Sequence, residues 1–381
     1  MSRSPRITVI GAGSFGGWTA LALLRRGADV TLLDAWGPGH PRSSSGGETR
    51  IIRATYGSRP LYTTLAAQAL RRWREEEHRW HHGCLHQTGA MWMGPASHPF
   101  LEASATALTN EGLAFDRLSP TEAARRFPQV HMGDIGEVLV EPDAGLLLAR
   151  HACAQVATQF QREGGTLMHA SAAVPLDGPH VRLTDGHLLE ADFTIAAAGP
   201  WLGHLLPDLL GHHITPTRQP SHFFGTPAGD TRYLTPHLPI WLEMGDHVMY
   251  GIPGNGHRNF KIGDDHPGDT IDPETMDRTV SAQEIALMRE YMSHRFPGLA
   301  GAPWLGAEVC QYEATPDSDF IIDQHPTHSG LWIVGGGSGH GFKMGPVIGD
   351  MVTAAILDGQ PTDPTFALAR FAAGSTPAKW A

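Results

Sequence analysis

Apolar and glycine positions alternate along residues 7–34 in an order that predicts a strand, a turn, a helix and a second strand. Residues 7–10 are apolar or β-branched, and glycines follow at positions 11, 13 and 16. Residues 15–26 then have helical spacing and end at a glycine, and residues 30–33 form a second apolar run that ends at Asp34. This order is typical of a β-α-β unit that binds a dinucleotide, although an ordinary glycine loop is the alternative.

Each part of this unit has a predicted role. Gly11 permits the tight turn, Gly13 lets the backbone approach a pyrophosphate, and Gly16 lets the helix pack closely on the strand. The pyrophosphate would lie at the helix N-terminus, where free N–H groups point toward it. Asp34 stands where a carboxylate accepts hydrogen bonds from ribose hydroxyls.

The rest of the chain predicts an α/β fold in which the nucleotide-binding domain is discontinuous in sequence. Apolar residues spaced four apart between 148 and 160 indicate a helix, and residues 193–198 indicate a buried strand that ends at Gly199. Residues 331–334 are a further buried strand, followed by a glycine-rich stretch and a helix at 346–357. We assign 1–85, 146–220 and 306–381 to a Rossmann-like domain, and 86–145 and 221–305 to a substrate domain with a mixed or antiparallel sheet.

Composition excludes some classes of protein. A chain of 381 residues can bury a large core. Its formal net charge of −11 argues against binding nucleic acid, which requires clustered Lys and Arg. Three cysteines are too few for a disulfide framework, and no apolar run has the length of a membrane span. We expect a soluble, cytoplasmic monomer with neither a nucleic-acid nor a membrane partner.

The second glycine stretch, residues 335–341, bears on which dinucleotide is bound. A nicotinamide enzyme needs one glycine turn, whereas a flavin enzyme must also hold a ring system that gains negative charge on reduction. The stretch offers close backbone approach, Lys343 offers a cation, and the following helix offers the positive end of its dipole. These features favour FAD, and the alternative is a loop that merely crosses the sheet edge.

Five segments resemble the sarcosine oxidase-like amine oxidases, the family of monomeric sarcosine oxidase and N-methyltryptophan oxidase within the D-amino acid oxidase group. They occur in the family's order across nearly the whole chain, and are residues 11–16, 47–57, 310–317, 320–323 and 338–343. The second and last segments are far more specific than the first. The resemblance implies an FAD-dependent oxidase of an N-methyl or cyclic amino acid, which forms an imine that hydrolyses and reduces O₂ to H₂O₂.

The resemblance also implies site residues. Cys310 matches the cysteine that carries the flavin through a thioether, and the alternative is a buried free thiol. The predicted cofactor-binding residues are Gly11, Gly13, Ser14, Phe15, Gly16, Asp34, Ser44, Ser45, Thr49, Arg50, Val174, Gly199, Trp201, Cys310, Gly339, His340, Gly341, Phe342 and Lys343.

Five residues are the predicted catalytic set. Arg53 and Lys343 match the pair that binds the substrate carboxylate, as a planar fork and a point charge. Lys261 matches the lysine that activates oxygen, because a fixed ammonium stabilises developing superoxide. Tyr250 and Tyr312 match residues that line the substrate pocket. Surface charges and core tyrosines are the corresponding alternatives.

Two positions depart from the family. Gly46 stands where the family often has a histidine before the Arg-Ile-Ile-Arg stretch, and Asp265 replaces a histidine four residues after the lysine. These changes concern the amine substrate and its proton handling.

A metal site and other functions are alternatives. The chain has 23 histidines, and His78, His81, His82 and His86 gather near Cys84, but their spacing matches no zinc pattern. We therefore predict no metal. A dehydrogenase that passes electrons to a quinone or a carrier protein, a non-catalytic flavin-binding subunit and a nicotinamide dehydrogenase are the other functions considered.

Overall fold

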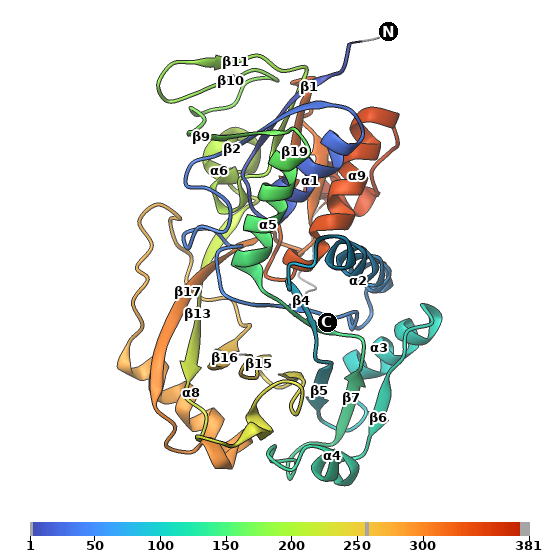
Figure 1. Cartoon of the computed structure of the whole chain (residues 1–381), viewed down its shortest axis with the longest axis vertical. Helices are drawn as coiled ribbons and strands as arrows, with labels where there is room; N and C mark the ends of the chain where they lie inside the picture. The colour runs from blue at the N-terminus through green and yellow to red at the C-terminus, as the bar shows by residue number, and fades with distance from the viewer. Residues whose placement is uncertain (1–2, 256–258, 374–381) are drawn as a thin grey trace.

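A computed structural model describes residues 3–255 and 259–373. Figure 1 shows two large sheets, one above the other, with helices packed around the upper sheet. Smaller sheets join and extend them. The predicted α/β class is confirmed.

The upper sheet has six strands and is parallel except at one edge. In spatial order these are β18 (Ile321–Gln324), β19 (Leu331–Gly335), β12 (Phe193–Ala196), β1 (Arg6–Ile10), β2 (Asp29–Asp34) and β9 (Thr166–His169). Only β18 runs antiparallel to its neighbour. Because the parallel strands end at one edge, their loops gather on the same side of the sheet.

The first glycine turn has the predicted geometry. Gly11 has a φ of 105°, and a Cβ there would lie 2.3 Å from the Ala197 carbonyl oxygen. A Cβ at Gly16 would lie 1.9 Å from the Gly11 carbonyl oxygen. Glycine is therefore required both for the turn and for the close contact between β1 and the following helix, α1 (Ser14–Arg25).

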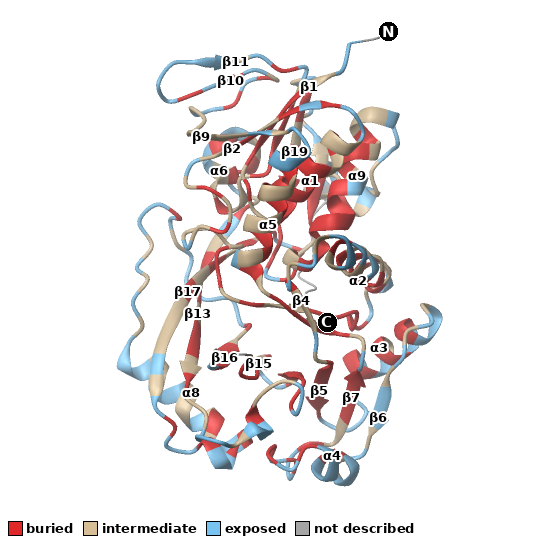
Figure 2. Ribbon diagram, viewed as in Figure 1, coloured by how far each residue is buried: buried red, intermediate tan, exposed pale blue. Residues whose placement is uncertain are grey.

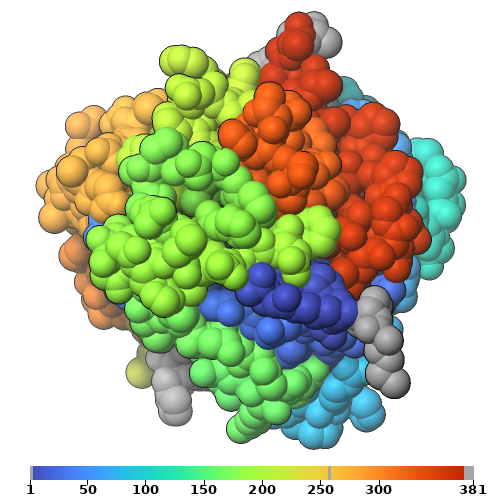
Figure 3. Space-filling model, turned by 90° about the horizontal axis from the view of Figure 1, so that it is seen from above, coloured from blue at the N-terminus to red at the C-terminus, as the bar shows by residue number. Residues whose placement is uncertain are grey.

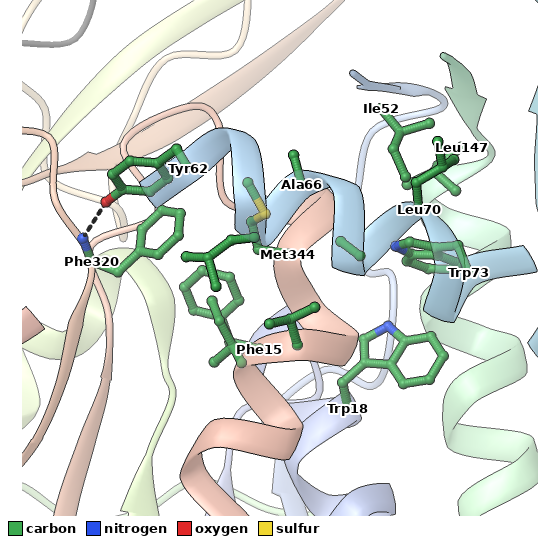
Figure 4. Packing of buried hydrophobic residues seen from close by; sticks show 14 of the residues in the cluster. Phe15, Trp18, Ile52, Tyr62, Ala66, Leu70, Trp73, Leu147, Phe320 and Met344 are labelled. Carbon is green, nitrogen blue, oxygen red and sulfur yellow. Dashed lines mark hydrogen bonds between the residues drawn. The ribbon is translucent and has the colours of Figure 1, made fainter. Parts of the chain in front are cut away.

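Helices cover the upper sheet. They are α1, α2 (Pro60–Trp80), α5 (Ala149–Arg162) and α9 (Gly345–Asp358). Figure 4 shows α2 lying across α1 and the start of α9, with the Tyr62 ring beside Phe320 and the Trp73 ring beside Trp18. The Tyr62 hydroxyl also accepts a hydrogen bond from the Phe320 N–H at 3.3 Å.

The upper end of the molecule combines distant parts of the chain. In Figure 3 the blue N-terminal segment lies beside green segments from the middle and orange to red segments from the last third. Strand β12 pairs with β1 on one side and with β19 on the other, so the first, middle and last parts of the chain share one sheet. A small hairpin, β10 (Val181–Arg182) with β11 (Leu188–Leu189), and two short helices, α6 (Leu202–Leu205) and α7 (Pro207–Leu210), complete this region.

The lower sheet has eight strands. In order they are β17 (Trp304–Ala314), β13 (Thr215–Phe224), β16 (Phe260–Asp264), β15 (Met249–Ile252), β14 (Ile240–Glu243), β5 (Ala90–Gly94), β7 (Glu137–Glu141) and β6 (Asp116–Leu118). Only the β14–β5 pair is parallel, so the sheet is mixed. Helices α3 (Pro99–Asn110), α4 (Pro120–Arg126) and α8 (Ala282–Arg295) accompany it.

Strands β13 and β17 each cross a predicted domain boundary. The predicted boundaries after residues 220 and 305 fall inside these strands, which pair with each other along their length. Figure 1 shows both running from the upper region down the edge of the lower sheet. The division into two domains stays a prediction.

A third sheet joins the two large ones. It consists of β3 (Arg50–Ile52), β8 (Gly145–Leu147) and β4 (Leu85–Gln87). Figure 2 shows the upper strands and the inner faces of α1 and α9 buried, whereas α4 and α8 are largely exposed. None of the helices in the described part of the chain is both long and apolar enough to cross a bilayer.

Candidate active site

Two adjoining cavities lie between the sheets. The larger, of about 380 Å³, follows the carboxyl ends of β1, β2 and β12. The smaller, of about 80 Å³, is lined by side chains from β15, β16 and β17. Arg50, Tyr312, Gly339 and Phe342 line both cavities. The two cavities therefore adjoin at these residues and together form the candidate site.

The predicted cofactor-binding residues gather at these cavities. Those that line the larger one are Gly11, Gly13, Ser14, Phe15, Asp34, Ser44, Ser45, Arg50, Val174, Gly199, Trp201, Gly339, Gly341 and Phe342. Those that line only the smaller one are Thr49, Cys310, His340 and Lys343. Gly16 lines neither, because it lies in the contact between α1 and the glycine turn.

The predicted catalytic residues lie together as well. Arg53, Tyr250, Lys261, Tyr312 and Lys343 all line the smaller cavity. They come from five separate stretches of the chain. Their roles stay predictions, but the fold brings their side chains to one place.

The N-terminus of α1 faces the larger cavity. The Ser14 N–H donates to the Ser45 hydroxyl oxygen at 3.1 Å, so the serine-rich loop lies against the helix start. One Asp34 oxygen accepts from the Ala12 N–H at 2.7 Å. The other accepts from the Trp36 and Gly37 N–H groups at 2.9 and 2.6 Å. These bonds hold the Asp34 carboxylate at the cavity wall.

Cys310 has a cation beside it. The Arg50 guanidinium donates to the Cys310 sulfur at 3.0 Å and to the carbonyl oxygens of Thr49 and Ser44 at 2.7 and 2.6 Å. Burial lowers the pKa of Arg50, but Cys310 and the nearby tyrosines outweigh burial, so the net pKa is raised. Arg50 is therefore a permanent positive charge at the sulfur.

Lys261 is a buried ammonium with only 4% of its surface exposed. Its Nζ donates to the Thr49 carbonyl oxygen at 3.3 Å, the same oxygen that accepts from Arg50. Burial, followed by the charge of Arg50, lowers the pKa of Lys261 to about 8. The side chain is thus protonated at neutral pH but loses its charge at mildly alkaline pH.

Arg53 and Lys343 lie over the same aromatic ring. The Arg53 guanidinium carbon is 4.6 Å from the Tyr56 ring centroid, and the Lys343 Nζ is 5.3 Å from it. Both side chains are 4% exposed. The Arg53 guanidinium donates to the Thr55 carbonyl oxygen, and the Lys343 Nζ donates to the His340 carbonyl oxygen at 2.8 Å. Burial lowers the pKa of Arg53. Two cations beside one cavity can together bind an anion.

The two tyrosines remain neutral donors. Burial raises the pKa of Tyr250 and of Tyr312 well above the usual range. The Tyr312 hydroxyl donates to an Asp265 oxygen at 2.8 Å. Asp265, the residue that replaces the family's histidine, therefore lies in the smaller cavity and is held by a predicted pocket residue.

The other departure also has a structural reason. A Cβ at Gly46 would lie 1.9 Å from the His40 carbonyl oxygen, so this tight loop admits no side chain. The Gly46 carbonyl oxygen accepts from Arg150 Nε at 2.9 Å. The Gly46 N–H also donates to the Ser43 carbonyl oxygen at 3.0 Å, so the loop is held by both its own backbone and the Arg150 side chain.

Sequence reasoning did not identify Tyr56 and Glu313 as site residues. Tyr56 lies within a segment that carried the resemblance, and its place under both cations was not evident. Glu313 follows Tyr312, lines the larger cavity and is 8% exposed. Its acidic side chain in a strand with buried neighbours was the one available signal.

The residues present fit a large polar ligand such as FAD. Among the described residues, three buried oxygens at the cavities have no hydrogen-bond partner: Ser44 Oγ, Thr49 Oγ1 and Glu313 Oε2. Buried polar atoms are normally satisfied, so such a group of oxygens indicates a ligand with matching donors and acceptors. Gly11, Gly13 and Gly339 line the larger cavity, so a ligand there can approach the backbone.

A possible metal-ligand cluster lies outside the two cavities. Within residues 3–255 and 259–373, one trio has ligand atoms within 4.8 Å of one another, His131, Asp134 and His294, and all three are exposed. Arg295 donates to both Asp134 oxygens, at 2.8 and 3.2 Å. A bound cation would have to compete with that guanidinium. This trio shares no residue with the histidines at 78–86 that the sequence analysis weighed as a metal site.

The chain is similar to known proteins along nearly its whole length. The family model of FAD dependent oxidoreductases matches residues 6–355. Monomeric sarcosine oxidase of Bacillus sp. (strain NS-129) is 30% identical over 370 residues, covering 94% of this chain and 95% of that protein. N-methyl-L-tryptophan oxidase of Salmonella typhi is 30% identical over 385 residues, covering 96% and 98%.

A solved structure has the same fold. L-proline dehydrogenase from P. horikoshii has a TM-score of 0.84 at 20% identity, covering 99% of this chain and all of that chain (100%).

Proposed function

The chain belongs to the family of FAD-dependent oxidoreductases, and we propose that it is an oxidase of secondary amines that carry a carboxylate. The substrate class is an N-methyl or cyclic amino acid. Relatives named for sarcosine and N-methyl-L-tryptophan support this class, since both compounds are N-methyl amino acids. The observation that carries the proposal is the buried pair of cations, Arg53 and Lys343, over Tyr56.

The cation pair would bind and orient the substrate. The Arg53 guanidinium offers a planar fork and the Lys343 ammonium a point charge, which together suit a carboxylate next to the reacting carbon. Because both are buried, an anion between them replaces lost hydration and is attracted strongly. The small volume beside them, about 80 Å³, supports a small substrate.

The remaining residues of the smaller cavity would exclude water and hold protons. Tyr250 and Tyr312 keep their hydroxyl protons, because burial raises their pKa values. No strong general base is required of them, since orientation and electrostatic stabilisation supply the catalytic gain. Bound FAD supplies the two-electron acceptor that takes a hydride from the substrate carbon and later passes the electrons to O₂.

Three residues would hold the cofactor and serve the oxygen reaction. Cys310 is the proposed thioether attachment point on the flavin 8-methyl carbon, and the Arg50 guanidinium lies 3.0 Å from its sulfur. Lys261 provides the ammonium that stabilises superoxide as O₂ is reduced to H₂O₂. Its contact with the Thr49 carbonyl oxygen fixes the ammonium in place.

We further propose that the protein acts as a cytoplasmic monomer on a small molecule and O₂. The name of its monomeric sarcosine oxidase relative supports the monomer. The three cysteines, all unpaired, support a reducing compartment.

A peroxide assay tests the proposal. The purified protein is given sarcosine, N-methyltryptophan, pipecolate and proline, each beside the matched amine that lacks the carboxylate. We expect H₂O₂ with at least one amino acid and little with its decarboxylated partner. No amine-dependent flavin reduction under anaerobic conditions would contradict the proposal. Anaerobic reduction without H₂O₂ in air would instead favour a dehydrogenase.

A further inference from the structure

Glu313 is a buried carboxyl group surrounded by backbone. It lies on β17, three residues after Cys310, at the wall of the larger cavity. A Cβ at Gly199 or Gly335 would lie 3.3 or 3.7 Å from its Oε2, and one at Gly337 would lie 2.9 Å from its Oε1. Gly337 and Gly199 thus leave room for this side chain, whereas a Cβ at Gly335 would first meet Leu202 at 2.1 Å.

One oxygen of this carboxyl is satisfied and the other is not. Glu313 Oε1 accepts from the Gly337 N–H at 3.1 Å. Oε2 is buried and has no hydrogen-bond partner among the described residues. A buried oxygen without a hydrogen-bond donor destabilises the folded chain, so a bound group that donates to it would remove this penalty.

Within residues 3–255 and 259–373, Glu313 forms no ion pair that would account for the burial of its carboxyl. Burial raises its pKa to about 7, and the Gly337 N–H only partly offsets this effect. A structural ion pair is therefore not its purpose. A neutral hydroxyl is a suitable partner, because it donates a hydrogen bond without requiring a compensating charge.

Its place along the cavity indicates which part of a dinucleotide would meet it. On one side is Gly199, close to Ala197, whose carbonyl oxygen borders Gly11 in the pyrophosphate turn. The preceding residue on β17, Tyr312, lines both cavities. In FAD the part between the diphosphate and the ring system is the ribityl chain, and it carries hydroxyl groups.

We propose that the Glu313 carboxyl binds a ribityl hydroxyl of FAD and is a cofactor-positioning residue. This inference rests on the family's cofactor and is independent of which amine is oxidised. A contact with the diphosphate is the competing interpretation.

Binding measurements on the full chain distinguish the two. The Cys310→Ser background makes FAD binding reversible, and FAD and ADP are titrated separately by fluorescence and calorimetry. ADP contains the diphosphate but no ribityl chain. We expect Glu313→Ala to raise the dissociation constant of FAD about tenfold, as the loss of one such hydrogen bond predicts, and to leave that of ADP within twofold.

Further variants separate hydrogen bonding from folding. Glu313→Gln keeps a polar group of the same length and should bind FAD within about threefold of the parent. Glu313→Asp withdraws the carboxyl by one methylene and should reproduce the selective loss, which preserves the test if the alanine variant does not fold. Glu137→Gln, on β7 of the lower sheet, is the control and should change neither constant.

Three results would overturn the inference. The first is a dissociation constant of FAD that is unchanged in Glu313→Ala and Glu313→Asp. The second is an equal loss of affinity for FAD and for ADP. The third is a Glu313→Gln variant that binds FAD as weakly as Glu313→Ala does. These results are binding measurements and need no turnover, so they can be told apart from a failure of the amine oxidase proposal.

Discussion

The Nη2 atom of Arg50 lies 3.0 Å from the sulfur of Cys310, although 260 positions separate the two residues. The arginine is on β3, in the small sheet between the two large ones, and the cysteine is on β17. This contact places a permanent cation at the one cysteine that is only partly buried. A flavin attached there would be held at the junction of the two cavities.

Cys310→Ser should abolish covalent attachment, because a serine hydroxyl is not ionised at neutral pH and is a far weaker nucleophile. The measurement is the distribution of yellow colour after acid precipitation. Colour should stay with the pellet of the unaltered protein and pass to the supernatant of the variant. Cys84→Ser, which changes a buried cysteine away from the cavities, should behave as the unaltered protein. Free flavin from the unaltered protein would refute the attachment.

Lys261→Met should slow the reaction of reduced enzyme with O₂ by about 100-fold, the usual effect of losing one electrostatic stabiliser. Reduction by the amine under anaerobic conditions should change by only a few fold. Stopped-flow absorbance measures both half-reactions. An oxygen reaction that survives the substitution would remove Lys261 from its proposed role.

The same lysine predicts a pH dependence. Its pKa is lowered to about 8, so the ammonium is present below pH 8 and is lost as the pH rises through that value. The rate of the oxygen reaction should therefore fall across pH 8 in the unaltered protein and stay flat in Lys261→Met. A flat profile in both proteins would show that another charge controls the reaction.

Arg53→Met and Lys343→Met should each lower kcat/KM for a carboxylated amine about 100-fold, which corresponds to losing roughly 3 kcal/mol of a buried charge pair. The matched amine without the carboxylate should be affected much less, because it makes no contact with the cations. Steady-state peroxide release measures both. Arg126→Met, on exposed α4, is the control. Equal losses for the two kinds of amine would indicate a general structural effect.

Glu313→Gln should stabilise the FAD-free chain at pH 8 but not at pH 4.5. The folded-state pKa is raised to about 7 from an ordinary value of 4.5. Below pH 4.5 both folded and unfolded forms hold the proton, so there is no penalty. Between pH 4.5 and 7 only the unfolded form releases the proton, so the folded state loses stability as the pH rises. Above pH 7 the full loss is about 3 kcal/mol of the free energy of unfolding. Urea unfolding at pH 5, 6.5 and 8 measures the growing difference, and a constant difference would contradict it.

Gly16→Ala should disturb the cofactor site, because the new methyl would lie 1.9 Å from the Gly11 carbonyl oxygen. Moving backbone to relieve such a contact costs about 1–3 kcal/mol. We expect a lower urea midpoint and a lower FAD content in the purified protein. Gly17→Ala is a matched control on the same helix, where the nearest atom to the methyl is a Val156 methyl at 3.4 Å. Equal effects of the two substitutions would refute the close-contact account.

The sequence by itself determined the first β-α-β unit and the α/β class. The reason is that the required contacts are local: Gly11 and Gly16 meet each other, and Asp34 receives the Ala12 N–H, all within residues 7–34. Motif resemblance added the identities of distant residues, such as Lys261 and Lys343, that line the smaller cavity. The spacing of residues along the chain does not give the distances between these side chains in the folded protein.

Only the tertiary structure decided how distant segments meet. Tyr56 lies under both Arg53 and Lys343, which is 290 positions further along the chain than Arg53. Among the described residues, Glu313 Oε2 has no hydrogen-bond partner, because β17 packs against the glycine loop that follows β19. Burial and hydrogen bonding of a side chain depend on every segment around it, and a pattern along one strand contains only a part of that environment.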